Sequence, residues 1–150
     1  MCHKNSFTFN FPSDVCTILA LQAFQVMHDS ACLADPTTNS YCYLSAVQNP
    51  NPSDLYFYSL PLGIPLPPTT TPSCSSCSKT VMGLYATALQ DSSQAGPLTG
   101  LKSTYQVSAK IAVQFCGAAF ARTSISAATS LLCRLPTISI GFILFIWILW

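Results

Sequence analysis

The chain has 150 residues, which is enough for one domain, and only 7% of them are charged. Its five acidic residues are all aspartates, and its six basic residues form no run, so the formal net charge is only +1. This composition lacks the basic patch typical of nucleic-acid-binding proteins. Eight cysteines approach the usage of disulfide-rich secreted domains. We therefore expect an oxidising compartment and no nucleic-acid partner.

The N-terminal segment 1–12 contains Lys4 as its one basic residue and has no apolar block of the length found in signal peptides. For a secreted protein, this predicts a truncated start with the signal upstream of Met1. If the start is complete, the disulfide interpretation is wrong.

A first helix should begin at Val15, capped by Ser13 or Asp14, and end before Asp29. Its predicted buried face consists of apolar residues at helical spacing, namely Ile18, Leu19, Ala23, Val26 and Met27.

Cys32 and Cys42 bracket a run of turn-forming residues that follows this helix. The two sulfurs could therefore be joined across a local loop. Such a bridge would stabilise the fold by roughly 3 kcal/mol on the chain-entropy model.

Residues 49–73 contain seven prolines, which disfavour a helix. Tyr56, Phe57, Tyr58 and Leu60 would be costly to leave in water. We therefore expect this segment to be an extended strap lying on the helices. A disordered linker is the alternative.

Residues 74–120 predict an antiparallel helical hairpin around which the fold is organised. Two apolar stripes at helical spacing lie on either side of a break at Gly96-Pro97. The first consists of Cys77, Val81, Leu84, Tyr85, Ala88 and Leu89, and the second of Leu101, Tyr105, Ala109, Ala112, Cys116 and Phe120. A short link makes the two helices neighbours, so we expect a disulfide from Cys116 to Cys74 or Cys77.

Together these elements predict an all-α fold. It should be a small disulfide-stapled helical domain over residues 13–120, with about three core helices, followed by a hydrophobic tail.

The C-terminal part consists of a small and polar spacer at 121–134 and an uncharged apolar tail at 135–150. As a helix, the tail would span about 24 Å, less than the roughly 30 Å of a bilayer's hydrocarbon core. This pattern is typical of a glycosylphosphatidylinositol (GPI) attachment signal, with Ser124 or Ser126 as the attachment residue. A tail-anchored transmembrane helix is the alternative.

Tail removal would also remove Cys133 and leave an odd number of cysteines. The candidates for disulfides are then Cys16, Cys32, Cys42, Cys74, Cys77 and Cys116, together with Cys2. We therefore expect a further cysteine upstream of Met1.

Several motifs occur in a specific order along the chain. They are Cys32…Tyr41-Cys42, Tyr58-Ser59-Leu60-Pro61-Leu62-Gly63, Cys74-Ser75-Ser76-Cys77 and Cys116-Gly117. In this order and spacing, the chain resembles a fungal family classed as a domain of unknown function. The resemblance covers about residues 15–120 and implies a secreted, cysteine-rich protein, often with a signal peptide and an anchor-like tail. It implies no catalytic residues, and this chain departs from the family by lacking the signal peptide.

The Cys74-Ser-Ser-Cys77 motif at a helix start could be a redox pair, because a helix N-terminus lowers a thiol pKa. Against this, a proline-rich segment precedes it rather than the strand of a thioredoxin-like unit. With His3 and His28 as the chain's histidines, the paired spacing of a zinc site is missing and no catalytic constellation forms. We therefore expect no metal and no cofactor.

These observations predict a structural or interaction role without enzymatic activity. The expected location is the extracellular face of the plasma membrane or the cell wall. The expected partners are the membrane, through the lipid anchor or the tail helix, and cell-wall components or surface proteins. The alternative is a secreted enzyme or a thiol-redox protein that uses Cys74 and Cys77. The two hypotheses differ in whether both cysteines are bonded to other elements.

Overall fold

The computed structural model describes residues 13–125. Over this range the chain folds into five α-helices and one 3₁₀ helix, with no β-strand beyond an isolated bridge between Ala34 and Tyr41. The helices are α1 (Ser13–Ala31), α2 (Cys42–Gln48), η1 (Pro52–Leu62), α3 (Ser76–Gln90), α4 (Ser92–Ala95) and α5 (Thr99–Cys116). The predicted all-α, disulfide-stapled fold is confirmed. The predictions for segment 1–12, Cys2, His3, Ser126, Cys133 and tail 135–150 lie outside the described residues.

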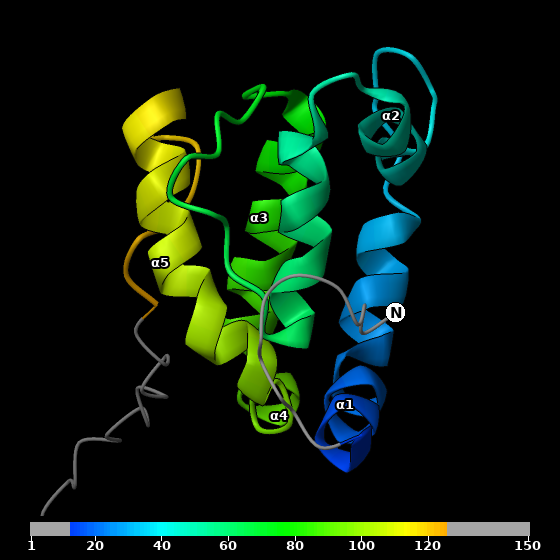
Figure 1. The fold of residues 1–150 in the computed structure, drawn as a ribbon, viewed down its shortest axis with the longest axis vertical. Helices are drawn as coiled ribbons and strands as arrows, with labels where there is room; N and C mark the ends of the chain where they lie inside the picture. The colour runs from blue at the N-terminus through cyan, green and yellow to red at the C-terminus, as the bar shows by residue number, and fades with distance from the viewer. Residues whose placement is uncertain (1–12, 126–150) are drawn as a thin grey trace, which may run out of the picture.

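Helices α3 and α5 form the predicted hairpin and pack against each other (Figure 1). The short helix α4 occupies the link between them, and Asp91 caps it by accepting a hydrogen bond from Ser93 N at 2.9 Å. The second apolar stripe includes Phe120, which lies beyond the end of α5. The helix ends at Cys116 because Gly117 adopts φ 90°, a conformation that other residues rarely adopt. Phe120 is nevertheless buried, and its ring lies 6.3 Å from that of Phe57.

The strap prediction is wrong for residues 52–62, which form the helix η1. Pro52 lies in the first turn, where a missing N–H removes no helical hydrogen bond. Asn51 caps this turn by accepting from Ser53 N at 3.1 Å. At the other end, Gly63 at φ 80° terminates η1 and donates its N–H to Leu60 O at 3.0 Å. A proline in the first turn and a glycine after the last turn therefore delimit a helix in this segment.

Helix η1 lies at the centre of the domain and contacts α1, α2, α3 and α5. In Figure 1 it is the unlabelled green helix between α1 and α5. Its Phe57 and Leu60 side chains are fully buried, and Tyr58 is nearly so. The core thus forms around a segment that carries the most specific sequence motif of the chain.

The end of η1 approaches α5 closely along a row of small residues spaced four apart. A Cβ atom added to Gly100 would lie 2.9 Å from Gly63 N and closer still to Pro61 O. One turn later, Thr104 Oγ1 donates to Leu60 O at 2.8 Å. After one more turn, Ser108 Oγ accepts from Leu66 N at 3.1 Å. Small side chains therefore let the backbone after η1 lie directly on α5, and two hydroxyls satisfy its polar groups.

Helix α1 differs from its prediction in length and in its buried face. It begins at Ser13 and continues to Ala31, past the predicted end before Asp29. Ala23 and Val26 are buried as predicted, but Ile18 is 52% exposed. The buried row continues instead through Ser30, whose hydroxyl donates to Met27 O and accepts from Tyr85 Oη.

We predict that Gly100→Ala lowers the free energy of unfolding by roughly 1 to 3 kcal/mol, because the new methyl group would overlap with the backbone of η1. The matched control is Gly83→Ala in α3, where an added Cβ meets nothing within 4 Å. That change should raise stability by roughly 0.5 to 1 kcal/mol, since alanine is the better helix former. Urea titration measures both values. An unchanged stability for Gly100→Ala would show that the η1 and α5 contact is looser than described.

Candidate functional site

Two disulfides join the described elements. Cys74 bonds to Cys116 with Cα atoms 5.4 Å apart, so the predicted bridge between the ends of the hairpin is confirmed. Cys77 bonds instead to Cys42 at the start of α2, with Cα atoms 5.3 Å apart. The two sulfurs of the Cys74-Ser-Ser-Cys77 motif are thus bonded to different elements. This arrangement removes the observation on which the redox hypothesis depended.

The proposed local bridge between Cys32 and Cys42 is wrong. The loop between them is already closed by backbone hydrogen bonds, from Cys42 N to Leu33 O at 2.8 Å and from Asp35 N to Ser40 O at 2.9 Å. Cys42 therefore faces α3 and reaches Cys77, while Cys32 carries an exposed thiol 3.8 Å from His28 Nε2. Cys16 lies on α1 and belongs to neither of these two bridges.

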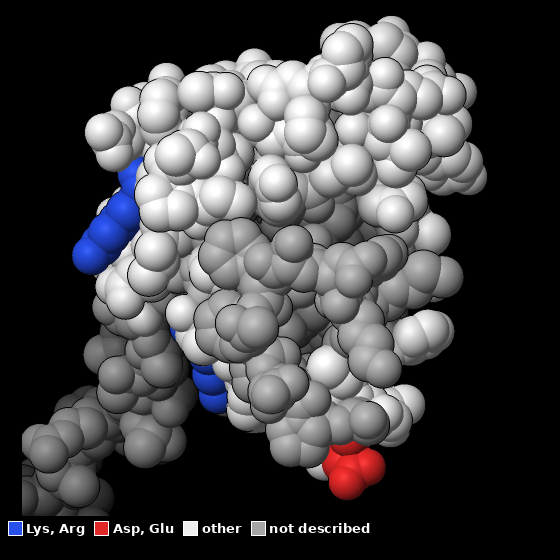
Figure 2. Space-filling view, viewed as in Figure 1, with Lys and Arg blue, Asp and Glu red and all other residues white. Residues whose placement is uncertain are grey.

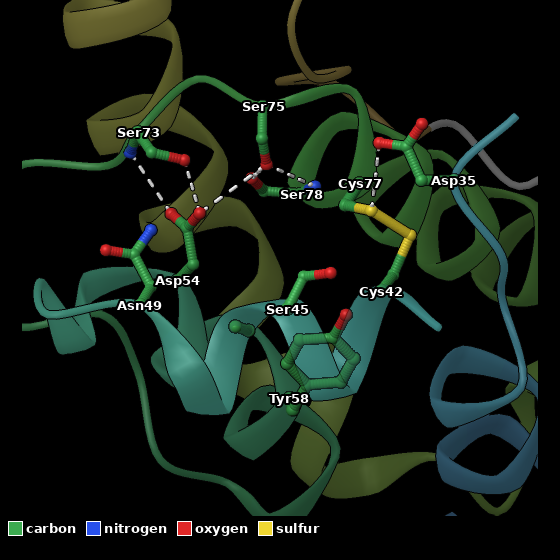
Figure 3. Close-up of a pocket in the computed structure, with 11 residues that line it drawn as sticks. Asp35, Cys42, Ser45, Asn49, Asp54, Tyr58, Ser73, Ser75, Cys77 and Ser78 are labelled. Atoms are coloured by element: carbon green, nitrogen blue, oxygen red, sulfur yellow. Dashed lines mark hydrogen bonds between the residues drawn. A yellow bond between two sulfur atoms is a disulfide. The ribbon is translucent and has the colours of Figure 1, made fainter. Parts of the chain in front are cut away.

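A cavity of about 110 Å³ lies beside the bridge from Cys42 to Cys77 (Figure 3). It lies between α2, η1 and the start of α3, and the disulfide joins α2 to α3. Its lining consists of Asp35, Cys42, Ser45, Ala46, Asn49, Asp54, Tyr58, Ser73, Ser75, Cys77 and Ser78. The lining is rich in hydroxyl and carboxylate oxygens and contains no histidine, lysine or arginine.

Asp54 in the first turn of η1 is a buried carboxylate, only 6% exposed. Its charge is satisfied by the segment before α3, because Ser73 donates to it through both N and Oγ. Ser75 Oγ also donates to it, at 3.4 Å. Ser75 is in turn the N-cap of α3 and accepts from Ser78 N at 3.1 Å. Asp54 therefore fixes the start of α3 relative to η1, as Figure 3 shows.

Asp35 lies at the opposite side of the cavity and closes the loop before α2. Its carboxylate accepts from the hydroxyl of Thr37 at 2.5 Å, from Thr37 N at 2.8 Å and from Ser76 Oγ at 2.8 Å. The Thr37 hydroxyl and these further donors lower the pKa of Asp35 to about 2. Its Oδ2 also lies 3.6 Å from Cys77 Sγ, a close contact without a hydrogen, since that sulfur is in a disulfide.

Tyr58 forms part of the cavity wall on the η1 side. Its ring packs edge-on against Tyr43 with centroids 5.0 Å apart. Its hydroxyl oxygen is buried and has no hydrogen-bond partner in the structure. Burial, followed by the negative charge of Asp54, raises the pKa of the Tyr58 phenol to about 12. The hydroxyl is therefore a neutral group at physiological pH.

The structure places the other candidate residues away from this cavity. His28 lies in the last turn of α1 and pairs with Asp29 at 3.3 Å on the surface. Within residues 13–125 no group of three metal-ligating side chains comes together, and none of the helices there is both long and apolar enough to cross a bilayer. Ser124 is exposed just after the buried Phe120.

Sequence reasoning did not identify Asp54 and Tyr58 as site residues. One signal for Asp54 was available, since it opens the apolar run Leu55 to Leu60, where a charge needs partners. The donors, Ser73 and Ser75, are about 20 residues away in a serine-rich stretch that has no distinguishing pattern.

The fold and the site define a small all-α domain closed by two interlocked disulfides around a polar cavity. The family model described as domain of unknown function DUF7729 matches residues 2–125, so the chain belongs to the DUF7729 family. No curated protein matches the chain, and no solved structure matches it.

The depressed pKa of Asp35 predicts how stability depends on pH. A carboxylate with a lowered pKa in the folded state stabilises that state above the unfolded pKa, and the stabilisation is lost as pH falls. The free energy of unfolding should therefore fall between about pH 4 and pH 2, and Asp35→Asn should remove part of this dependence.

Thr37→Val should act in the same direction as Asp35→Asn, because the Thr37 hydroxyl is the largest cause of the shift. Thr37→Ser keeps a hydroxyl and serves as the control. Urea titrations across this pH range give the free energy of unfolding of each variant, and its slope against pH is compared. Equal slopes for the wild type, Asp35→Asn and Thr37→Val would show that the loop does not depend on this carboxylate.

Proposed function

We propose that this protein is a disulfide-stapled surface protein of a fungal cell with a structural or interaction role. Its place is the outer face of the plasma membrane or the cell wall. The observation that carries this proposal is the pair of disulfides, which connects α2, α3 and the end of α5. Such bridges form and persist in oxidising compartments. The resemblance to a fungal secreted family supports the same placement.

The composition of the described surface supports an interaction role. Few charges are visible in Figure 2, where most of the described face is neither acidic nor basic. Large apolar side chains are exposed on α1, with Leu21 at 73% and Phe24 at 67%. Others, Tyr41, Leu44 and Val47, are exposed on or next to α2. Exposed apolar groups on neighbouring elements are typical of surfaces that bind other molecules.

The arrangement of the cavity favours binding over catalysis. A hydrolytic nucleophile needs a base within hydrogen-bond reach, and the serines lining the cavity have no histidine or lysine among their neighbours there. The disulfides also occupy both sulfurs that a redox protein would use. We therefore propose a non-enzymatic role.

We further propose that a GPI anchor attaches the protein to the membrane. The described contacts bear on the choice between the two attachment residues. Ile125 packs against the core, and Gln106 Nε2 donates to Thr123 O at 3.5 Å. Cleavage after Ser124 would remove Ile125 from this packing, whereas cleavage after Ser126 would retain it. Ser126 is therefore the favoured attachment residue.

The test uses the complete reading frame expressed in the source cells. The mature protein should be in the membrane fraction, should be released by phosphatidylinositol-specific phospholipase and should lack peptides beyond about residue 128. Peptide mapping should recover Cys42 joined to Cys77 and Cys74 joined to Cys116. Ser124→Tyr should still be processed, and Ser126→Tyr should be processed less.

An intact tail peptide in membrane-bound protein would instead show a tail-anchored helix. Reduced cysteines at positions 42, 74, 77 and 116 in freshly trapped protein would contradict the extracellular placement itself. The two outcomes are separable, because thiol trapping reports on the compartment and tail peptides report on the anchor.

A further inference from the structure

The lining of the cavity beside Cys42 and Cys77 carries negative charge only. Two carboxylates, Asp35 and Asp54, line it, and no lysine, arginine or histidine does. In a chain with only five acidic residues, two of them border one small cavity. A ligand there meets negative charge and neutral hydroxyls. A cation or a hydrogen-bond donor is therefore favoured over an anion.

An independent observation is the hydroxyl of Tyr58. Tyr58 is 8% exposed, and its oxygen is buried without a partner. By contrast, the buried hydroxyls of Tyr85 and Tyr105 bond to Ser30 Oγ and Met82 O, each at 3.3 Å. Buried polar atoms in folded proteins are nearly always satisfied, so a lone one that lines a cavity indicates a missing partner. Figure 3 shows the Tyr58 oxygen directed toward Ser45, inside the ring of lining residues.

The hydrogen-bonding capacity of Asp54 also leaves room for a donor. An ionised carboxylate offers about four acceptor sites. Ser73 N, Ser73 Oγ and Ser75 Oγ occupy three of them, all from the segment before α3. The start of α3 does not create an anion site, because Ser75 already caps it. The remaining acceptor site of Asp54 is thus available to a group that donates a hydrogen bond.

The size of the cavity limits what can enter. Its volume is about 110 Å³, and a cavity of roughly 150 Å³ is needed to hold a benzene molecule. A group of a few non-hydrogen atoms fits, and a whole sugar ring does not. A hard metal ion is disfavoured, since within residues 13–125 no third carboxylate, histidine or free thiol joins the two aspartates.

We propose that this cavity binds the ammonium head of a primary amine. The ammonium has three N–H donors, which match the free acceptor site of Asp54 and the Tyr58 and Ser45 oxygens, and its positive charge is also attracted by the Asp35 carboxylate across the cavity. The remainder of the ligand extends from the open side of the cavity. Ethanolamine headgroups and amino sugars are two classes of molecule that carry such a group. The proposal is independent of the cellular location proposed above.

The test measures binding to the oxidised full chain by calorimetry or by NMR shift titration. Ethanolamine should bind with a dissociation constant on the order of a millimolar, as expected for so small a ligand. Its neutral isostere, ethylene glycol, should bind at least about tenfold more weakly, because hydrogen bonds to charged groups are the stronger ones. Glucosamine and glucose provide the same comparison of an amine with a neutral analogue on a sugar ring.

The variant Tyr58→Phe should weaken ethanolamine binding by roughly tenfold, since it removes one acceptor for the ammonium. It should remain folded, because it deletes a hydroxyl that has no protein partner. The matched control is Tyr56→Phe on the same helix, where the ring is 37% exposed and does not line the cavity. Asp35→Asn provides a second variant that removes a charge from the rim.

Tighter binding of glucosamine would identify an amino sugar as the source of the ammonium, and tighter binding of ethanolamine would identify a headgroup. Equal binding of ethanolamine and ethylene glycol would overturn the proposal in favour of a neutral polyol site. Absence of saturable binding by either amine would overturn it as well and leave a solvent-filled cavity. Binding unaffected by both Tyr58→Phe and Asp35→Asn would place the amine elsewhere.

Discussion

The close contact between the end of η1 and α5 is the constraint on which the rest of the structure depends. Gly100 leaves no side chain between the two backbones, and Thr104 and Ser108 supply hydrogen bonds to Leu60 O and Leu66 N. A buried backbone needs such partners, because an unsatisfied polar group costs roughly 1 to 3 kcal/mol. Small polar residues at four-residue spacing therefore determine where η1 lies. With η1 in place, Phe57 and Leu60 reach the core.

The two disulfides stabilise this arrangement from its edge. They close loops of 35 and 42 residues, and on the chain-entropy model each contributes about 4 kcal/mol. Together they connect α2, the start of α3 and the end of α5, which are three of the four helices that contact η1. Asp54 complements them by joining η1 to Ser73 and Ser75. The polar cavity exists because these connections meet at one end of the domain while no side chain fills the space between them.

The sequence was sufficient to predict the features that follow from a repeating pattern of apolar residues. The helical spacing of apolar residues predicted α3 and the core of α5, and antiparallel packing predicted a bridge from Cys116 to Cys74 or Cys77, of which the bridge to Cys74 forms. It was insufficient where long-range contacts decide the outcome. The partner of Cys42 depends on how α2 meets α3, which no local pattern encodes. Likewise, proline content argued against a helix at residues 52–62, although Pro52 can begin one and Phe57 is fully buried in the core. The cavity could not be predicted from the sequence, because it depends on both the bridge from Cys42 to Cys77 and the helix at residues 52–62.

The most direct measurement of the central claim is native-state hydrogen exchange at the Leu66 amide, which donates to Ser108 Oγ. If the contact between η1 and α5 holds the domain together, this amide should exchange only through global unfolding. Its opening free energy should then equal that of the slowest α5 amides and fall with denaturant to the same degree. Fast exchange at Leu66 that is independent of denaturant, with α5 still protected, would contradict the account. In that case the segment after η1 would open locally and could not be what positions the core.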